Sequence, residues 1–270
     1  MNSDEIEMIE GYRAAVVKTF AEVFAAEAGR FSDGQRLLRR FNEAVDHAMA
    51  GSPLSAMSEA HNEMCVARAL LLNTKPRFSS LAYEPALPGC AKTIDYCGVS
   101  TEGLRVYVDV KTISPVPTDR WEQFEEAQRE KWFPENVHVG LFKDWMGGET
   151  WHGWIAGRGR MLEYTLELEQ KIRESGLNGR TDTSIILALC GTGFQWHESQ
   201  LEDFADFYMS GCYRSDDSFV KMEAHFIEER KIILERTLTN IAYMERKTRA
   251  ILPKIMRWNV RGPADPERLF

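Results

Sequence analysis

Residues 104–113 decide the fold. They read Leu-Arg-Val-Tyr-Val-Asp-Val-Lys-Thr-Ile, in which valines alternate with charged or aromatic residues. Side chains of a β-strand point to opposite faces in turn, so the valines at 106, 108 and 110 share one face. Tyr107, Asp109 and Lys111 share the other face. At about 3.3 Å per residue, Asp109 and Lys111 lie about 7 Å apart along the strand. The pattern predicts a strand that buries its valines and presents a carboxylate beside an ammonium group.

The segment before this strand predicts its antiparallel partner. Residues 92–99 also alternate, and Asp95 points away from the apolar residues on either side of it. A three-residue loop, Thr101-Glu102-Gly103, places Asp95 directly across from Asp109 on the same face of the hairpin. The sequence therefore predicts a hairpin that carries two facing carboxylates.

Two facing carboxylates repel each other unless a cation lies between them. Mg²⁺ takes oxygen ligands and keeps several of its waters, so it suits such a pair. The neighbouring Lys111 can stabilise charge on a scissile phosphate and help to orient or deprotonate the attacking water. Asp95, Asp109 and Lys111 together predict a site for phosphodiester hydrolysis with Mg²⁺ or Mn²⁺.

This arrangement resembles the PD-(D/E)xK nuclease superfamily, the restriction-endonuclease-like enzymes. The motif here reads Ile94-Asp95, then thirteen residues, then Asp109-Val110-Lys111. It departs from the commoner pattern by having Ile before the first Asp and Asp in place of Glu before Lys. The resemblance covers roughly residues 53 to 192. It implies a metal-dependent nuclease, with an endonuclease acting on DNA as the expected activity.

The resemblance also implies roles for individual residues. Asp95 and Asp109 would bind the metal ion, and Lys111 would assist the water and the developing phosphate charge. The family often has a Glu on the helix before the sheet, and Glu63 occupies that place, with Glu59 one turn earlier as the fallback. Glu63 shares a helical stripe with apolar residues, so we expect it to face the sheet and to complete the metal site.

The D/E-x-K pattern alone is not specific, because it occurs four times, at 109–111, 169–171, 229–231 and 245–247. The last three matches lie in segments with helical periodicity. Three other interpretations stay open. The first is a surface ion pair on an exposed strand. The second is a catalytically silent nuclease-fold module that acts in nucleic-acid binding or assembly. The third is a helical scaffold with no ligand.

Periodicity along the rest of the chain predicts an α/β protein. We expect a restriction-endonuclease-like mixed central sheet flanked by helices, with helical additions at both ends. The predicted helices span 4–28, 32–50, 53–73, 118–132, 160–175, 200–209 and 217–252. The predicted strands span 77–86, 92–99, 104–113 and 184–189. The expected divisions are an N-terminal helical segment (1–51), a nuclease-like core (52–212) and a long C-terminal helix with a basic tail (213–270).

Composition sets further bounds. The chain has 270 residues, 44% of them apolar and 27% charged, which is typical of a globular protein. Its net charge of −8 argues against coating nucleic acid through bulk charge, although an acidic enzyme can still present one basic face. No apolar run is long enough to cross a membrane, and no basic segment precedes an apolar one at the N-terminus, so we expect a cytoplasmic location. The five cysteines form no C-x-x-C pair, which argues against a structural zinc site.

Basic residues outside the motif are candidates for contacts with nucleic acid, and the resemblance implies DNA as that nucleic acid. Arg158 and Arg160 open the helix that follows the first strands, and Lys254 and Arg257 belong to a basic block near the C-terminus. Solvated helix ends would give the same pattern. The long terminal helices make a homodimer plausible, since their apolar faces need a partner.

Overall fold

The computed structural model describes residues 3–52, 54–113, 157–191, 240–245 and 250–259. Three helices come first and are followed by three strands, a helix and three more strands. They are α1 (Ser3–Ala26), α2 (Gly34–Met49), α3 (Ser55–Leu72), β1 (Phe78–Tyr83), β2 (Tyr96–Ser100), β3 (Arg105–Thr112), α5 (Gly157–Glu174), β4 (Thr183–Gly191), β5 (Asn240–Glu245) and β6 (Lys254–Asn259). The predicted helices 118–132 and 200–209 lie outside the described residues. No helix within the described ranges is long and apolar enough to cross a membrane.

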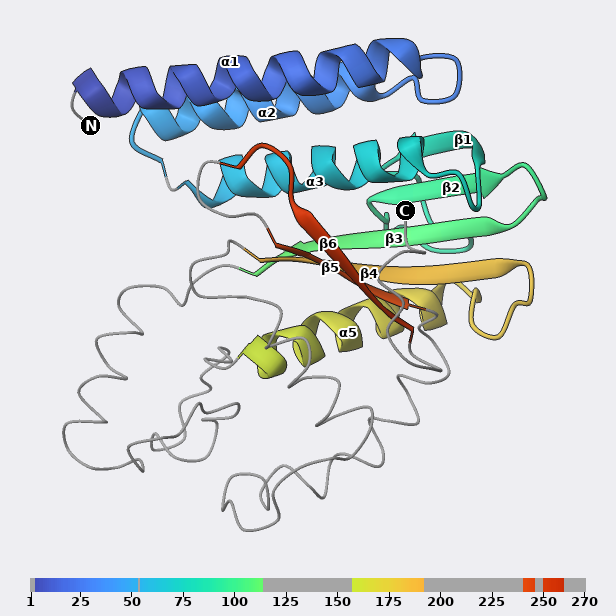
Figure 1. Ribbon diagram of the computed structural model, residues 1–270. Coiled ribbons are helices and arrows are strands. Elements are labelled where there is room, and N and C mark those ends of the chain that lie inside the picture. Colours follow the sequence, from blue (N-terminus) through green and yellow to red (C-terminus); the bar gives the residue numbers. More distant parts are fainter. Residues whose placement is uncertain (1–2, 53, 114–156, 192–239, 246–249, 260–270) are drawn as a thin grey trace, which may run out of the picture.

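The six strands form one mixed sheet in the order of the sequence, β1 to β6. The first three strands pair antiparallel, β3 to β4 and β4 to β5 are parallel, and β5 to β6 is antiparallel again. Helix α3 packs on one face of this sheet, with α1 and α2 behind it, and α5 covers the opposite face (Figure 1). The chain is therefore an α/β protein, as predicted.

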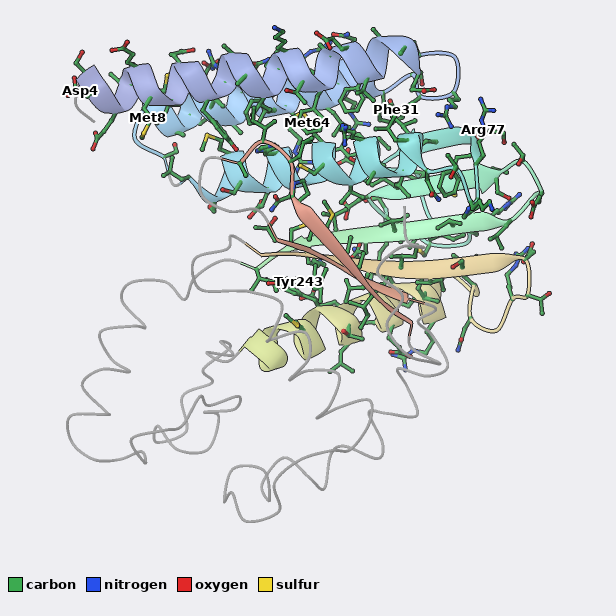
Figure 2. All side chains as sticks on the ribbon, viewed as in Figure 1. Asp4, Met8, Phe31, Met64, Arg77 and Tyr243 are labelled. Carbon is green, nitrogen blue, oxygen red and sulfur yellow. The ribbon has the colours of Figure 1, made fainter. Side chains whose placement is uncertain are left out.

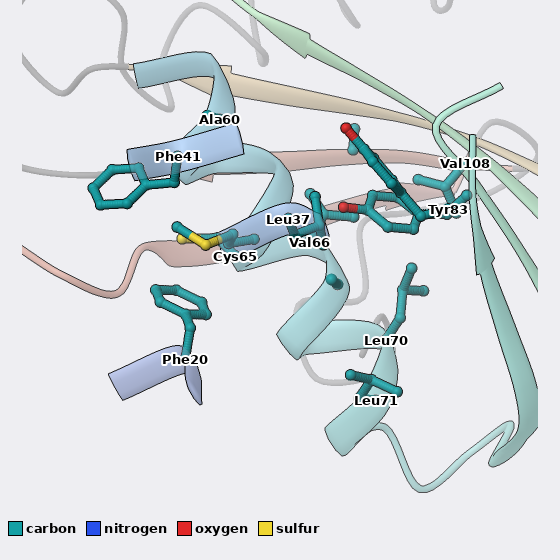
Figure 3. Packing of buried hydrophobic residues seen from close by; sticks show 14 of the residues in the cluster. Phe20, Leu37, Phe41, Ala60, Cys65, Val66, Leu70, Leu71, Tyr83 and Val108 are labelled. Atoms are coloured by element: carbon teal, nitrogen blue, oxygen red, sulfur yellow. The ribbon is translucent and has the colours of Figure 1, made fainter. Parts of the chain in front are cut away.

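Two apolar cores hold the layers together, one on each face of the sheet. The larger core joins the three N-terminal helices to the valine face of β3, and its members include Phe20, Phe41, Leu70 and Val108 (Figure 3). Side chains fill the layers between the helices, as the view with all described side chains shows (Figure 2). The smaller core joins Leu168 and Ile172 of α5 to Leu187 and Leu189 of β4. Each face of β3 is thus covered by a different helical layer.

The hairpin between β2 and β3 has the predicted register. Tyr96 pairs with Val108 and Val99 with Arg105, so the connecting loop has the three residues expected. The Ser100 hydroxyl oxygen accepts hydrogen bonds from the backbone N–H groups of Glu102 and Leu104. Gly103 has a φ of 87°, a left-handed conformation that glycine adopts without strain.

Two predictions from the sequence are wrong, one near the C-terminal end of the described chain and one at the start of α3. The helix predicted over 217–252 does not extend through its last part, because residues 240–245 form β5, and the basic block contributes β6. The four central residues of β5, from 241 to 244, are all buried. A strand buried on both faces has no alternation and resembles a helix in its periodicity. In addition, α3 begins at Ser55 after Leu54, not at the predicted Ser52–Pro53 start.

The contact between α1 and α2 depends on Gly34. A Cβ atom at Gly34 would lie 2.6 Å from Cβ of Phe24, an atom too close to the backbone to move away. We expect Gly34→Ala to lower the free energy of unfolding by about 1–3 kcal/mol in urea denaturation, because the helices must separate. Gly11 of α1 is the matched control, since nothing lies within 4 Å of its added Cβ. Equal stability of the two variants would show that the contact does not limit packing.

Candidate active site

Asp95 lies immediately before β2, where the hairpin register places it opposite Asp109 of β3. Its Oδ2 atom accepts a hydrogen bond of 2.5 Å from the backbone N–H of Val110. Burial and then the charge of Asp109 raise the pKa of Asp95 to about 6, against the lowering effects of that N–H and of two nearby lysines. The two carboxylates are therefore close enough to repel each other.

Asp109 is the most enclosed member of the site, with a side chain only 1% exposed. Its Oδ1 atom lies 2.7 Å from Nζ of Lys171 on α5. Its Oδ2 atom lies 3.6 Å from Nζ of Lys111, beyond hydrogen-bond reach. This buried oxygen accepts no hydrogen bond from any described residue. Since buried polar atoms are normally partnered, Asp109 has room for a further ligand.

Lys111 is half-enclosed between acidic groups on the α5 face of the sheet. Its Nζ atom donates to Oε2 of Glu167 at 2.9 Å and lies 5.6 Å from the centre of the Tyr164 ring. Burial alone would lower the pKa of Lys111, but Asp109, Glu167 and Asp95 outweigh it and the pKa is raised. Lys111 is therefore placed as a charged hydrogen-bond donor on this face of the sheet.

Lys171 belongs to the site, and sequence reasoning missed it. It lies in the match at 169–171, which was set aside because that match is helical. The buried stripe of α5 includes Leu168 and Ile172, and Lys171 lies next to this stripe and reaches Asp109. The signal was a basic residue at the border of an apolar helical stripe after the sheet.

The structure does not bring Glu63 together with the other three residues. Glu63 faces the sheet, as expected, but from α3, on the face opposite to Asp109 and Lys171. Its Oε2 atom accepts hydrogen bonds from the Tyr83 hydroxyl at 2.7 Å and from Arg40 at 2.6 Å. Burial and, to a smaller degree, the charge of Asp95 raise the pKa of Glu63 to about 7, although these two donors lower it. The fallback residue, Glu59, is exposed.

Asp95 and Asp109 fit a divalent cation as a two-carboxylate site. The fit rests on the unpartnered buried oxygen of Asp109 and on the mutual repulsion of the two groups. Mg²⁺ is often held by one or two carboxylates, with waters and substrate phosphates as its other ligands. Within the described ranges no group of three or more His, Cys, Asp or Glu is placed to hold a metal ion.

The residues predicted to contact nucleic acid are placed only through their backbone. Arg158 and Arg160 lie in the first turn of α5, and Lys254 and Arg257 lie in β6 at one edge of the sheet. Their side chains lie outside the described part of the structure. These four positions stay predictions.

Comparison with known proteins adds no assignment. No family model, no curated protein and no solved structure matches this chain.

Proposed function

We propose that this chain is a metal-dependent nuclease that hydrolyses phosphodiester bonds, with DNA as substrate and endonucleolytic cleavage as its mode. The observation that carries the proposal is the buried Asp109 carboxylate opposite Asp95, with one oxygen unpartnered and two lysines beside it. The mixed sheet flanked by helices is compatible with the restriction-endonuclease-like fold that the motif implies.

Each residue of the site has a separate role in the proposed reaction. Asp95 and Asp109 would hold Mg²⁺ or Mn²⁺, which supplies Lewis acidity and a more acidic bound water. The Val110 N–H orients the Asp95 carboxylate by fixing its Oδ2 atom. Lys111 keeps its charge and about a fifth of its side chain is exposed, so it can donate to a phosphate oxygen as negative charge develops. Glu63 is left out of this chemistry and stabilises the junction of α2, α3 and β1.

A second candidate is the catalytically silent module. It is favoured by the pairing of both lysines in the site, Lys171 with Asp109 and Lys111 with Glu167. Both lysines thus have an acidic partner in the absence of a metal ion. Calorimetric titration with Mn²⁺ separates the two candidates. If wild type binds Mn²⁺ and Asp95→Ala does not, the silent module is excluded.

The proposal is tested by incubating supercoiled plasmid and single-stranded DNA with the protein in Mg²⁺ or in EDTA. We expect cleavage in Mg²⁺ only, and Lys111→Ala to reduce it by about 10²- to 10³-fold, the usual loss when one donor to a developing anion is removed. Lys92→Ala is the matched control, since it removes an exposed lysine whose partner is Glu174, also on α5. Equal cleavage by wild type and Lys111→Ala would refute the assignment of these residues to a nuclease site.

A further inference from the structure

The four central groups of the site are balanced in charge before any ligand binds. Asp95 and Asp109 face each other across the hairpin, and Lys111 and Lys171 approach the two oxygens of Asp109 from the strand and from α5. Two carboxylates and two ammonium groups sum to zero. Glu167, which pairs with Lys111, adds a negative charge at the more exposed rim.

A divalent cation at Asp109 would therefore meet a like charge. Oδ1 of Asp109 is already in contact with Nζ of Lys171 at 2.7 Å. A metal ion lies about 2 Å from a carboxylate oxygen, so an ion at the unpartnered Oδ2 of Asp109 would lie within about 7 Å of this ammonium group. At that separation like charges in a half-buried site repel strongly. Lys171 can relieve the repulsion because its side chain is 24% exposed and flexible.

We infer that Lys171 is the resident counter-ion of Asp109, which leaves Asp109 when a divalent cation binds and turns to the phosphate that accompanies it. This inference rests on the proposed nuclease function and adds a property to it. A phosphodiester group brings one negative charge to a site that the cation has made positive. The cation and the phosphate should thus bind cooperatively, each raising the affinity for the other by the same factor.

The test is calorimetric titration of Mn²⁺ into metal-free wild type, Lys171→Gln, Lys171→Arg and Lys92→Gln. Each protein is titrated with and without a fixed concentration of thymidine 5′-monophosphate, a phosphate probe that holds no diester to cleave. Lys92 is the matched control because it also pairs with an acidic group at 2.7 Å and the substitution removes the same charge. Circular dichroism establishes that each variant is folded.

We expect Lys171→Gln to bind Mn²⁺ alone about tenfold more tightly than wild type, within the usual span of couplings between sites. Lys171→Arg, which keeps the charge, should bind no more tightly than wild type, and Lys92→Gln should match it. Thymidine monophosphate should tighten Mn²⁺ binding to wild type by about fivefold or more, and less in Lys171→Gln.

Three results would overturn the inference, and the third would also overturn the proposed function. Equal Mn²⁺ affinity of wild type and Lys171→Gln, or no effect of thymidine monophosphate on wild type, would show that Lys171 is not displaced while the metal site stands. If no protein in the set binds Mn²⁺ with or without the phosphate probe, the inference and the proposed function both fail. The effect of thymidine monophosphate on the Mn²⁺ affinity of wild type keeps the inference testable even if Lys171→Gln does not fold.

Discussion

Asp109→Asn is expected to lower the rate of Mg²⁺-dependent DNA cleavage by about 10³-fold, the upper end of the loss from removing one stabilising group of an active site. The substitution keeps the shape of the side chain and removes its charge. Asp109 is almost fully buried, and Asp95 is the carboxylate that the hairpin register places opposite it. The rate is measured on supercoiled plasmid with enzyme in excess, so that product release does not mask the chemical step.

The same substitution should also cost stability, and this effect can be separated from the loss of cleavage. Without a carboxylate at 109, Lys171 loses its partner in a site that leaves only 24% of its side chain exposed. The expected cost is about 2 kcal/mol, below that of breaking a fully buried pair. The double variant Asp109→Asn/Lys171→Gln should recover most of the stability and none of the cleavage. Cleavage by Asp109→Asn at the wild-type rate would contradict the role of Asp109.

The hairpin was predictable because two local rules fix it. Alternation in residues 104–113 sets the two faces of β3, and a three-residue loop sets the register that brings Asp95 opposite Asp109. A shift of one residue would have turned the valines to the α5 face and Asp109 and Lys111 to the α3 face. The local sequence was therefore enough to predict that the two carboxylates and Lys111 lie on the same face of the hairpin.

The partners of this hairpin were not predictable in the same way. Which helix covers which face depends on packing between segments far apart in the sequence. Glu63 was expected to face the sheet and does, but α3 covers the valine face and so places Glu63 away from Asp109. Lys171 was missed because its helix was considered alone, without the sheet on which it docks. β5 was read as helix because burial on both faces removes the alternation of a strand.

Glu63→Gln is expected to flatten the dependence of folding stability on pH by up to about 3 kcal/mol between pH 5 and pH 8. Burial raises the pKa of Glu63 to about 7 in the folded protein, above the value of 4.5 for the unfolded chain. Between these values the folded state binds more protons than the unfolded state. Stability of the wild type should therefore fall as pH rises from about 4.5 to about 7.

Glutamine is neutral at every pH and still accepts hydrogen bonds from Tyr83 and Arg40 through its amide oxygen, so the variant lacks this fall. Free energies from urea denaturation at pH 5 and pH 8 are taken as the difference between variant and parent, both measured in the Asp95→Asn background, because the charge of Asp95 adds to the raised pKa of Glu63. Glu27→Gln is a control without this fall: Arg30 lowers the pKa of Glu27, so Glu27 is ionised in the folded and the unfolded protein from pH 5 to pH 8, and its loss should cost the same stability at both pH values. Parallel curves for parent and Glu63→Gln would mean that the Arg40–Tyr83 environment holds Glu63 ionised throughout this range, and that α3 carries a buried charge beside the hairpin.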